Sequence, residues 1–280
     1  MTPSTTGKTR LCCLIGDPVE HSLSPRMFSA AFSSAGLDMV YLAFRVSRED
    51  LASAIEGLRA VDFVGCNVTM PHKLAAAKLV DRLEGTAELA CSINVISNNG
   101  GKLVGFNTDG AGALASLENV GVRLDGRRIL LIGYGGVARA VAFELAIKKK
   151  PLELLVTGRS SENAARLVRD LMASVPVQAK AIEIHGEENF DVIINATPVG
   201  MDPQEPLPLP ETVLRPGTVV FDLVYHPLET KLLQLAAMRG CTLINGVEML
   251  VRQGALAYER WTGLKAPVET MRTAAQEGLI

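Results

Sequence analysis

The segment from Ile129 to Arg139, ILLIGYGGVAR, constrains the fold of this chain more than any other part of its sequence. Four apolar residues suited to a buried strand lead into a turn with Gly133 and Gly135, and a helical pattern with Ala138 follows. This spacing matches the G-x-G-x-x-G/A pattern in its required context of strand, tight turn and helix. Such glycines let the backbone approach a pyrophosphate, and the helix N-terminus favours its negative charge. The segment predicts a dinucleotide site formed by Gly133, Tyr134, Gly135, Gly136, Val137 and Ala138, while a turn that needs glycine for its conformation alone is the competing interpretation.

The next expected strand indicates which dinucleotide binds. NAD enzymes commonly carry Asp or Glu about 20 residues beyond the glycines, bonded to the ribose 2′-hydroxyl. Here the strand is followed by Gly158, Arg159 and Ser160, and this end carries no carboxylate. An acidic side chain would repel a 2′-phosphate, whereas Arg159 and Ser160 can bind one. The loop therefore favours NADP(H), with a solvated loop charge as the other interpretation of Arg159.

Short β-rich runs alternate with longer helical patterns, which predicts an α/β fold with parallel strands. Ser47 to Asp50 reads as a capping box that opens a helix over 51–60. A hydrophobic content of 48% with few aromatic residues suits helices that cover a parallel sheet. The expected strands are 11–15, 40–46, 63–68, 129–132, 152–157, 192–195 and 219–223, and the expected helices include 25–35, 51–60, 74–83, 138–146 and 231–238.

A hairpin signal marks the division into domains. Two short apolar runs within 93–106 flank the sequence NNGG at 98–101, which is typical of a tight β-turn. A chain of 280 residues is long enough for two modest domains. We expect a first domain over 1–107, a doubly wound Rossmann-type dinucleotide-binding domain over 108–245, and a helical stretch over 246–280.

Charge and composition disfavour several functions. A net charge of −2 gives no electrostatic footprint for nucleic acid, and Lys148–Lys150 is expected to complement the dipole of a preceding helix. No apolar run reaches the roughly 20 residues of a membrane span. The five cysteines lack metal or redox spacing, and the four histidines are scattered. We expect a cytoplasmic protein with no metal site, no nucleic-acid partner and no membrane partner.

Three polar clusters follow expected strands, where open α/β sheets place ligands. They are 16–25, 67–73, and Asn94 with 107–110. Each has a simpler explanation: Ser24 with Pro25 as a helix cap, Asn67 and Thr69 as turn residues, and Lys73 as surface charge. Their joint occurrence ahead of a dinucleotide fold favours a substrate site.

In order and spacing, these motifs resemble the shikimate dehydrogenase family along nearly the whole chain. The resemblance implies two α/β domains, with the C-terminal helices returning to the N-terminal one. The substrate-binding and catalytic domain is then 1–107 plus 246–280. The matching motifs are HSLSP (21–25), NVTMPHK (67–73), SIN (92–94), FNTDG (106–110), GYGGVAR (133–139), NATPVGM (195–201), DLVYHPLET (222–230) and NGVEMLVRQG (245–254).

The resemblance also implies a reaction and its residues. The reaction is the reversible NADP(H)-dependent reduction of 3-dehydroshikimate to shikimate in aromatic amino-acid biosynthesis, by a monomer or homodimer. Lys73 and Asp109 form the catalytic pair: a lysine can protonate the developing alkoxide, and Asp109 can hold the ammonium. The charge of Asp109 favours protonated Lys73 and burial opposes it. The implied substrate residues are Ser22, Ser24, Asn67, Thr69, Asn94, Tyr225 and Gln253, and the implied cofactor residues add Gly158, Arg159, Ser160, Thr197, Leu223 and Gly246 to those of the glycine-rich turn.

Some positions depart from the family pattern. Cys91, Ser92 and Val95 stand where the family commonly has Gly, Ala and Thr, and Gly158 stands where it often has Asn. A second basic residue often follows Arg159 in the family, and 161–163 here reads SEN. A quinate/shikimate or aminoshikimate dehydrogenase is therefore an alternative. A nucleotide sensor without turnover is another, which the presence of both Lys73 and Asp109 disfavours.

Overall fold

The computed structural model describes residues 5–279, and the chain divides into two compact units. Unit 1 contains the chain up to Thr108 together with 251–278, and unit 2 contains 109–250 with Leu279. The sequence-based boundaries at 107/108 and 245/246 fall close to these divisions. Each unit has its own sheet and its own core.

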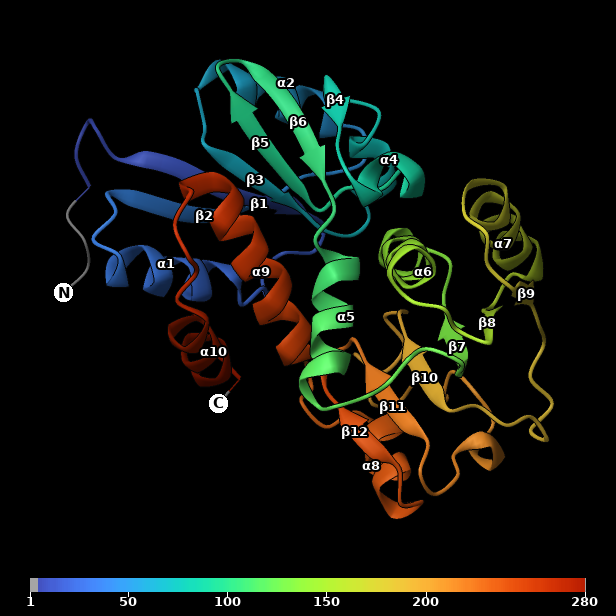
Figure 1. Cartoon of the computed structure of the whole chain (residues 1–280). Coiled ribbons are helices and arrows are strands. Elements are labelled where there is room, and N and C mark those ends of the chain that lie inside the picture. The colour runs from blue at the N-terminus through green and yellow to red at the C-terminus, as the bar shows by residue number, and fades with distance from the viewer. Residues whose placement is uncertain (1–4, 280) are drawn as a thin grey trace. The chain divides into compact units, whose positions relative to one another are not determined.

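Unit 1 is a mixed six-stranded sheet with helices packed against it (Figure 1). Its elements are β1 (Arg10–Gly16), α1 (Ser24–Ser34), β2 (Met39–Arg45), α2 (Leu51–Ala60), β3 (Gly65–Val68), α3 (Lys73–Ala76), β4 (Arg82–Leu83), α4 (Thr86–Ala90), β5 (Val95–Asn99), β6 (Lys102–Phe106), most of α9 (Gly246–Thr262) and α10 (Val268–Glu277). The strand order is β2-β1-β3-β5-β6-β4, and β5 alone runs opposite to the others. The ends of β1, β3 and β6 and the start of β5 therefore share one edge.

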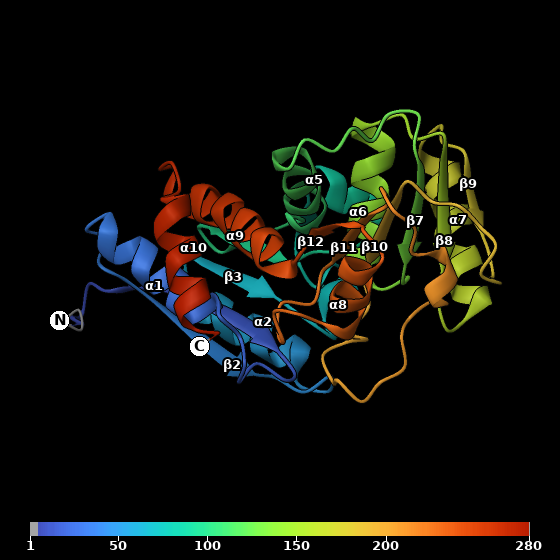
Figure 2. The same cartoon turned by 90° about the horizontal axis from the view of Figure 1, so that it is seen from below.

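The C-terminal helices join unit 1 because α9 approaches the sheet at a glycine. A Cβ on Gly65 in β3 would overlap the indole of Trp261, whose Nε1 donates to the Ile96 carbonyl at 3.1 Å. Gly254 similarly admits the methyl group of Met27 from α1. α10 lies beside α1, which Figures 1 and 2 show from two sides. The predicted helical tail is confirmed, with a break between α9 and α10.

Unit 2 is a wholly parallel sheet with the order β12-β11-β10-β7-β8-β9. In chain order this is the 3-2-1-4-5-6 arrangement of dinucleotide-binding folds, whose ligand crevice lies where the two halves meet, here between β7 and β10. Its elements are α5 (Asp109–Asn119), β7 (Arg128–Ile132), α6 (Gly136–Lys148), β8 (Glu153–Thr157), α7 (Ser161–Ser174), β9 (Ala179–Ala181), β10 (Val192–Asn195), the 3₁₀ turn η1 (Glu211–Val213), β11 (Val219–Asp222), α8 (Lys231–Met238) and β12 (Thr242–Ile244).

Burial on both faces explains the continuous apolar strands of unit 2. Leu130 and Ile132 face a core with Val213 and Leu232, and the alternate residues of β7 are equally buried. Because successive side chains point to opposite faces, both faces of this sheet are covered. The α/β prediction is confirmed for both units, and the expected parallel strands are confirmed for unit 2, whereas the antiparallel β5 makes the sheet of unit 1 mixed.

Most expected elements are confirmed within a residue or two, but the helix expected over 74–83 is wrong. α3 ends after one turn, and Arg82 and Leu83 pair with Val104 and Gly105 of β6. Pairing with the sheet thus overrides the helical pattern. The hairpin is confirmed, with Asn99 opposite Lys102. Its two turn glycines have φ of 63° and 88°, which glycine adopts without strain.

Of the two hydrogen bonds of a capping box, the segment that begins at Ser47 forms only one. The Asp50 N–H donates to Ser47 Oγ at 3.2 Å, as in a box. The Asp50 carboxylate, however, accepts from the Ser47 hydroxyl at 2.7 Å. This stretch forms a turn, and α2 begins after it at Leu51.

Candidate active site

Polar residues of unit 1 gather at the shared edge of its sheet. β3 ends there beside the start of β5, and the loop after β6 follows at the same edge. The loops after β1 and β3 begin at this edge as well. The edge therefore carries the predicted residues Ser22, Ser24, Asn67, Thr69, Lys73 and Asn94.

Asn94, directly before β5, is the buried centre of this edge. Its backbone carbonyl accepts from Asn67 Nδ2 at 3.0 Å. Its side-chain Oδ1 accepts from the Thr108 N–H at 2.8 Å. Its Nδ2 donates to Thr108 Oγ1 at 2.9 Å and to Gln253 Oε1 at 3.1 Å, so both amide hydrogens are engaged. A ligand that takes an N–H of Asn94 must displace one of these partners.

Asn67 is oriented by Tyr41, which the sequence patterns did not identify. The Tyr41 hydroxyl, in β2, donates to Asn67 Oδ1 at 2.7 Å. Burial raises the pKa of the Tyr41 phenol well above its ordinary value, which keeps it a neutral donor. Asn67 keeps one N–H and one lone pair beyond these bonds. It lies in β3 and links strands, so its interpretation as a turn residue is wrong.

The loops after β1 and β3 lie so close that glycine is needed between them. A Cβ on Gly16 would overlap Thr69 Cγ2. The Asp17 N–H donates to the Met70 carbonyl at 2.9 Å, which ties the loops together. Thr69 is thereby held half-buried at the shared edge.

Ser22 and Ser24 stand where α1 begins. The Ser24 N–H donates to Ser22 Oγ at 3.3 Å, and Ser24 is buried. The N-cap of α1 is Leu23, whose side chain makes no capping hydrogen bond, and the first N–H of the helix is met by Ser22 instead. The interpretation of Ser24 as a helix cap is therefore wrong.

Lys73 opens α3 in an anchored turn. The neighbouring His72 is buried, with Nε2 2.8 Å from the Val46 carbonyl, and Lys73 O accepts from the Ile93 N–H at 3.0 Å. Lys73 is half-buried, unlike the exposed Lys78 just after α3. Its backbone is thus fixed next to the segment that carries Asn94, which a plain surface charge does not require.

Asp109 is the first residue of α5 and of unit 2, and only 3% of it is exposed. It directly follows Thr108, the partner of Asn94 in unit 1. A carboxylate in the first turn of a helix is favoured by the helix dipole. Gly110 lets α5 approach α6, because a Cβ there would overlap the Ala140 carbonyl.

The glycine-rich turn after β7 fits a dinucleotide pyrophosphate. Gly133 has φ of +119°, which favours glycine, and a Cβ there would lie 3.0 Å from the Ala196 carbonyl. Gly135, the N-cap of α6, has an ordinary φ of −75°, and nothing lies within 4 Å of a Cβ there. Turn conformation thus explains Gly133 but not Gly135. The N-cap of α6 is a glycine, which places no side chain over this helix N-terminus, the end of a helix that favours an anion.

The loop after β8 is cationic at its tip. Arg159 is exposed, and within residues 5–279 it forms no ion pair. Ser160 is the N-cap of α7, where its Oγ accepts from the Asn163 N–H at 3.2 Å. The Ser160 hydroxyl can still donate to an anion. Glu162, in the first turn of α7, is paired with Arg166 at 3.6 Å.

Two buried side chains that the sequence analysis missed fix the loops after β10 and β11. Asn195 Nδ2 donates to Asp222 Oδ1 at 2.9 Å, and Asn195 Oδ1 accepts from the Thr197 hydroxyl at 2.6 Å. The Thr230 hydroxyl donates to Asp222 Oδ2 at 2.6 Å, and burial raises the pKa of the Asp222 carboxyl. Both side chains close a buried apolar strand, which is the signal that could have identified them. The Thr197 hydroxyl therefore holds its own loop.

Of the remaining predicted residues of unit 2, some follow β11 or begin α9, and others lie at the glycine-rich turn. A Cβ on Gly246 would overlap the carbonyl of Leu223, so packing within the unit already requires glycine there. Tyr225 is half-buried, and burial raises the pKa of its phenol. Tyr134 and Val137 are half-buried beside the turn glycines, whereas Ala138, in the first turn of α6, is fully buried.

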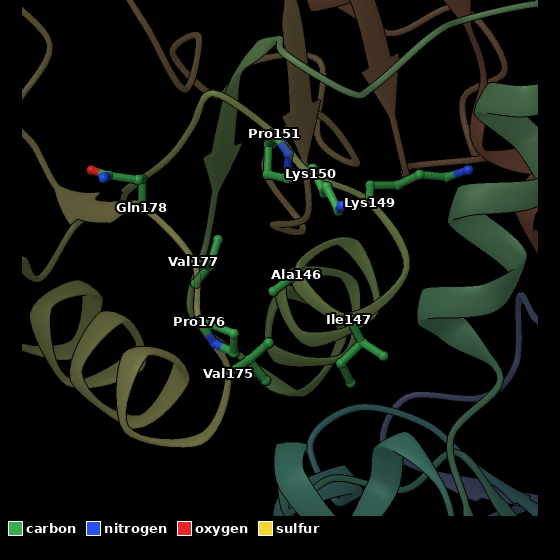
Figure 3. A pocket seen from close by; sticks show the side chains of 9 residues that line it. All are labelled: Ala146, Ile147, Lys149, Lys150, Pro151, Val175, Pro176, Val177 and Gln178. Carbon is green, nitrogen blue, oxygen red and sulfur yellow. The ribbon is translucent and has the colours of Figure 1, made fainter.

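A cavity of about 430 Å³ lies elsewhere in unit 2 (Figure 3). It opens at the amino ends of β8 and β9, the edge opposite the glycine-rich turn. Its lining is largely apolar, with Ala146, Ile147 and Val177. Lys149, which also lines it, pairs with Glu118 at 2.5 Å. Parallel α/β sheets bind ligands at their carboxyl edge, so this cavity is not the cofactor site.

Residues 5–279 contain no cluster of three or more potential metal ligands. None of the helices in this range has the length and apolar character to cross a membrane.

Comparisons with known proteins point to one family. The model of the shikimate dehydrogenase substrate binding domain matches residues 14–96, and that of the shikimate 5′-dehydrogenase C-terminal domain matches 246–276. The shikimate dehydrogenase (NADP(+)) of Methanopyrus kandleri is 45% identical over 99% of this chain and 98% of its own length. The shikimate dehydrogenase (NADP(+)) of Symbiobacterium thermophilum is 43% identical over 99% of this chain and 97% of its own length.

Solved structures agree along nearly the whole chain. A shikimate dehydrogenase in complex with NADP+ has a TM-score of 0.92 at 38% identity, covering 100% of this chain and 99% of its own. The Thermus thermophilus shikimate 5-dehydrogenase with NADP(H) and shikimate has a TM-score of 0.87 at 35% identity, covering 96% of this chain and 100% of its own. The Corynebacterium glutamicum quinate dehydrogenase with NAD has a TM-score of 0.86 at 27% identity, covering 96% of this chain and 99% of its own.

Proposed function

The chain belongs to the shikimate dehydrogenase family and is an NADP-dependent oxidoreductase of the CH–OH group, and we propose that Lys73 and Asp109 carry its acid–base chemistry. Its reaction is the reversible reduction of 3-dehydroshikimate to shikimate with NADP(H). The observation that supports the substrate site most is the buried chain from Tyr41 through Asn67 and Asn94 to Gln253. It aligns amide groups at the edge where Lys73 is anchored.

Unit 2 would hold the cofactor. When bound, NADPH supplies the hydride that the carbonyl carbon accepts. The N-terminus of α6 at Gly135 would receive the pyrophosphate, and Arg159 with Ser160 would receive the 2′-phosphate. We therefore assign residues 109–250 to dinucleotide binding and unit 1 to the substrate.

Lys73 would serve as the proton donor for the substrate oxygen. As the carbonyl carbon gains a hydride, its oxygen develops negative charge that an ammonium stabilises and then neutralises by giving up a proton. In the oxidation direction, neutral Lys73 takes the hydroxyl proton back. Asp109 would orient the lysine and accept a hydrogen bond from a substrate hydroxyl.

Neutral groups would bind the rest of a polyol acid. Ser22 and Ser24 can donate to the carboxylate, and they add no positive charge next to Lys73. Asn67 has an N–H and a lone pair to offer a ring hydroxyl. The other substrate contacts in this proposal are Thr69, Asn94, Tyr225 and Gln253.

The partner and location inferences rest on simpler observations. The formal net charge of −2 supports a small-molecule substrate rather than nucleic acid. All five cysteines are free thiols, which suits a reducing cytoplasm. We infer a monomer or homodimer.

The test of this function is oxidation of shikimate with NADP, followed by the absorbance of the reduced nicotinamide. We expect turnover that depends on both compounds. Tight NADP binding without any turnover of shikimate or quinate would instead favour a nucleotide sensor.

A further inference from the structure

Tyr134, in the glycine-rich turn, lies against Gly158 in the loop after β8. A Cβ on Gly158 would lie 2.8 Å from Cε1 and 3.0 Å from Cδ1 of the Tyr134 ring, closer than carbon atoms pack. The two loops are also tied by the Gly133 N–H, which donates to the Thr157 carbonyl at 2.8 Å. The ring therefore fills the space that a side chain at position 158 would need.

Backbone conformation does not account for glycine at 158. Its φ lies outside the positive range that favours glycine, in contrast to that of Gly133. After the two ring atoms, the nearest neighbour of a Cβ would be Gly133 Cα at 3.8 Å, an ordinary contact. The Tyr134 ring is thus the group that excludes a side chain here. Two adjacent ring atoms make the contact, so relief requires the whole ring to turn.

Position 158 directly follows β8, where the ribose of a bound dinucleotide is read. An acid at the end of this strand selects NAD, because it accepts from the 2′-hydroxyl and repels a 2′-phosphate. In this chain the same loop offers only the exposed Arg159 and the hydroxyl of Ser160. Position 158 is therefore a point at which one side chain would reverse the choice of cofactor.

We propose that Tyr134 is a specificity-determining residue, because its ring keeps side chains, above all a carboxylate, out of position 158. This inference rests on the proposed binding of NADP by unit 2. In this proposal two residues together set the choice of cofactor. Gly158 has no side chain, and the Tyr134 ring occupies the space that a side chain at position 158 would need. A carboxylate introduced at 158 alone cannot take the ribose-reading position until the ring is removed.

Binding of two nucleotide fragments to the full chain tests this coupling. The probes are 2′,5′-ADP and 5′-AMP, which differ only in the 2′-phosphate and carry no nicotinamide, with dissociation constants from calorimetry. The variants are Tyr134→Ala, Gly158→Asp and the double variant. We expect the wild type to prefer 2′,5′-ADP and Gly158→Asp to weaken both probes. The double variant should bind 5′-AMP at least about fivefold more tightly than Gly158→Asp does, the size of a modest coupling between residues in contact.

Tyr134→Phe keeps the ring, so Gly158→Asp combined with Tyr134→Phe should bind 5′-AMP as weakly as Gly158→Asp alone. Should Gly158→Asp fail to fold, the same comparison is made with Gly158→Ala, the smallest added side chain, alone and combined with Tyr134→Ala. Thermal unfolding is then the measurement. The Tyr134→Ala change should then restore the melting temperature that Gly158→Ala lowers.

The proposal is overturned if Gly158→Asp alone binds 5′-AMP as tightly as the double variant, or if Gly158→Ala costs the same stability with and without the ring. A wild type that fails to oxidise shikimate with NADP would instead contradict the proposed function and leave the measured coupling intact.

Discussion

Asn94 and Gln253 lie 159 positions apart in the chain and are joined by a hydrogen bond of 3.1 Å, from the Asn94 amide to the Gln253 carbonyl oxygen. Gln253 reaches this edge because α9 packs on unit 1, where Trp261 covers Gly65. Both bonded side chains are buried. The proposed substrate site thus depends on the C-terminal segment as much as on the N-terminal one.

Gln253→Ala should raise the KM for shikimate with little change in kcat. The variant removes a proposed hydrogen-bonding partner of the substrate and frees one N–H of Asn94. A lost bond at a buried site costs about 1–1.5 kcal/mol, which corresponds to roughly 5- to 12-fold. Steady-state kinetics with saturating NADP measure the effect, and Gln276→Ala on the exposed face of α10 is the control. A fall in kcat at constant KM would mean that Gln253 acts in the chemical step.

Lys73→Ala should lower kcat by about 10²–10⁴, the usual effect of a lost acid–base group, with the shikimate KM little changed. Lys78→Ala removes the exposed lysine just after α3 and should have no effect. Asp109→Asn should also impair turnover. The double variant should lose much less than the product of the two single losses, because Lys73 and Asp109 act as a unit. A raised KM with intact kcat in Lys73→Ala would make Lys73 a binding residue.

Arg159→Ala should raise the KM for NADP about tenfold or more, since a charge-assisted hydrogen bond contributes about 1.5–3 kcal/mol. NAD lacks the 2′-phosphate, so its KM should stay the same. Arg166→Ala, which removes another exposed arginine of the same region, is the matched control. The measurement is the ratio of kcat/KM for NADP over NAD, and an unchanged ratio would show that Arg159 serves only as a solvated charge.

Asp222 should make stability depend on pH. Burial raises the pKa of its carboxyl above the ordinary value of about 3.9. The folded protein therefore keeps this proton where the unfolded chain has lost it. The stability gained from the neutral carboxyl is full below about pH 4 and is lost as the pH rises through the folded pKa.

Asp222→Asn, which cannot ionise, should remove this dependence. Urea unfolding of both proteins at about pH 4 and about pH 7 checks it. The free energy of unfolding of the wild type minus that of the variant should be larger at the lower pH. A constant difference would show that Asp222 ionises alike in both states.

The parts of the fold that local pattern controls could be predicted from the sequence. Val192 to Ile194 are apolar because both faces of their sheet are covered, so the run is visible without a structure. β4 was not predictable, because two residues become a strand only by pairing with β6. In the site, Asn67 and Asn94 follow from their motifs. Tyr41 does not, since its bond to Asn67 crosses from one strand to another.

The contact between Tyr134 and Gly158 was equally hidden. The sequence shows both residues, in the glycine-rich turn and in the loop after β8, and shows that Gly158 departs from the family pattern. Only the packing of the two loops shows that one residue explains the other.

The most direct test of the function assigned here is a panel of four reactions, shikimate and quinate each with NADP and NAD, followed by the absorbance of the reduced nicotinamide. Arg159 and the absence of an acid at position 158 predict NADP, and Ser22 with Ser24 at the start of α1 supports shikimate. Shikimate with NADP should give the highest kcat/KM of the four, and a preference for quinate with NAD would contradict the substrate and cofactor assignments together.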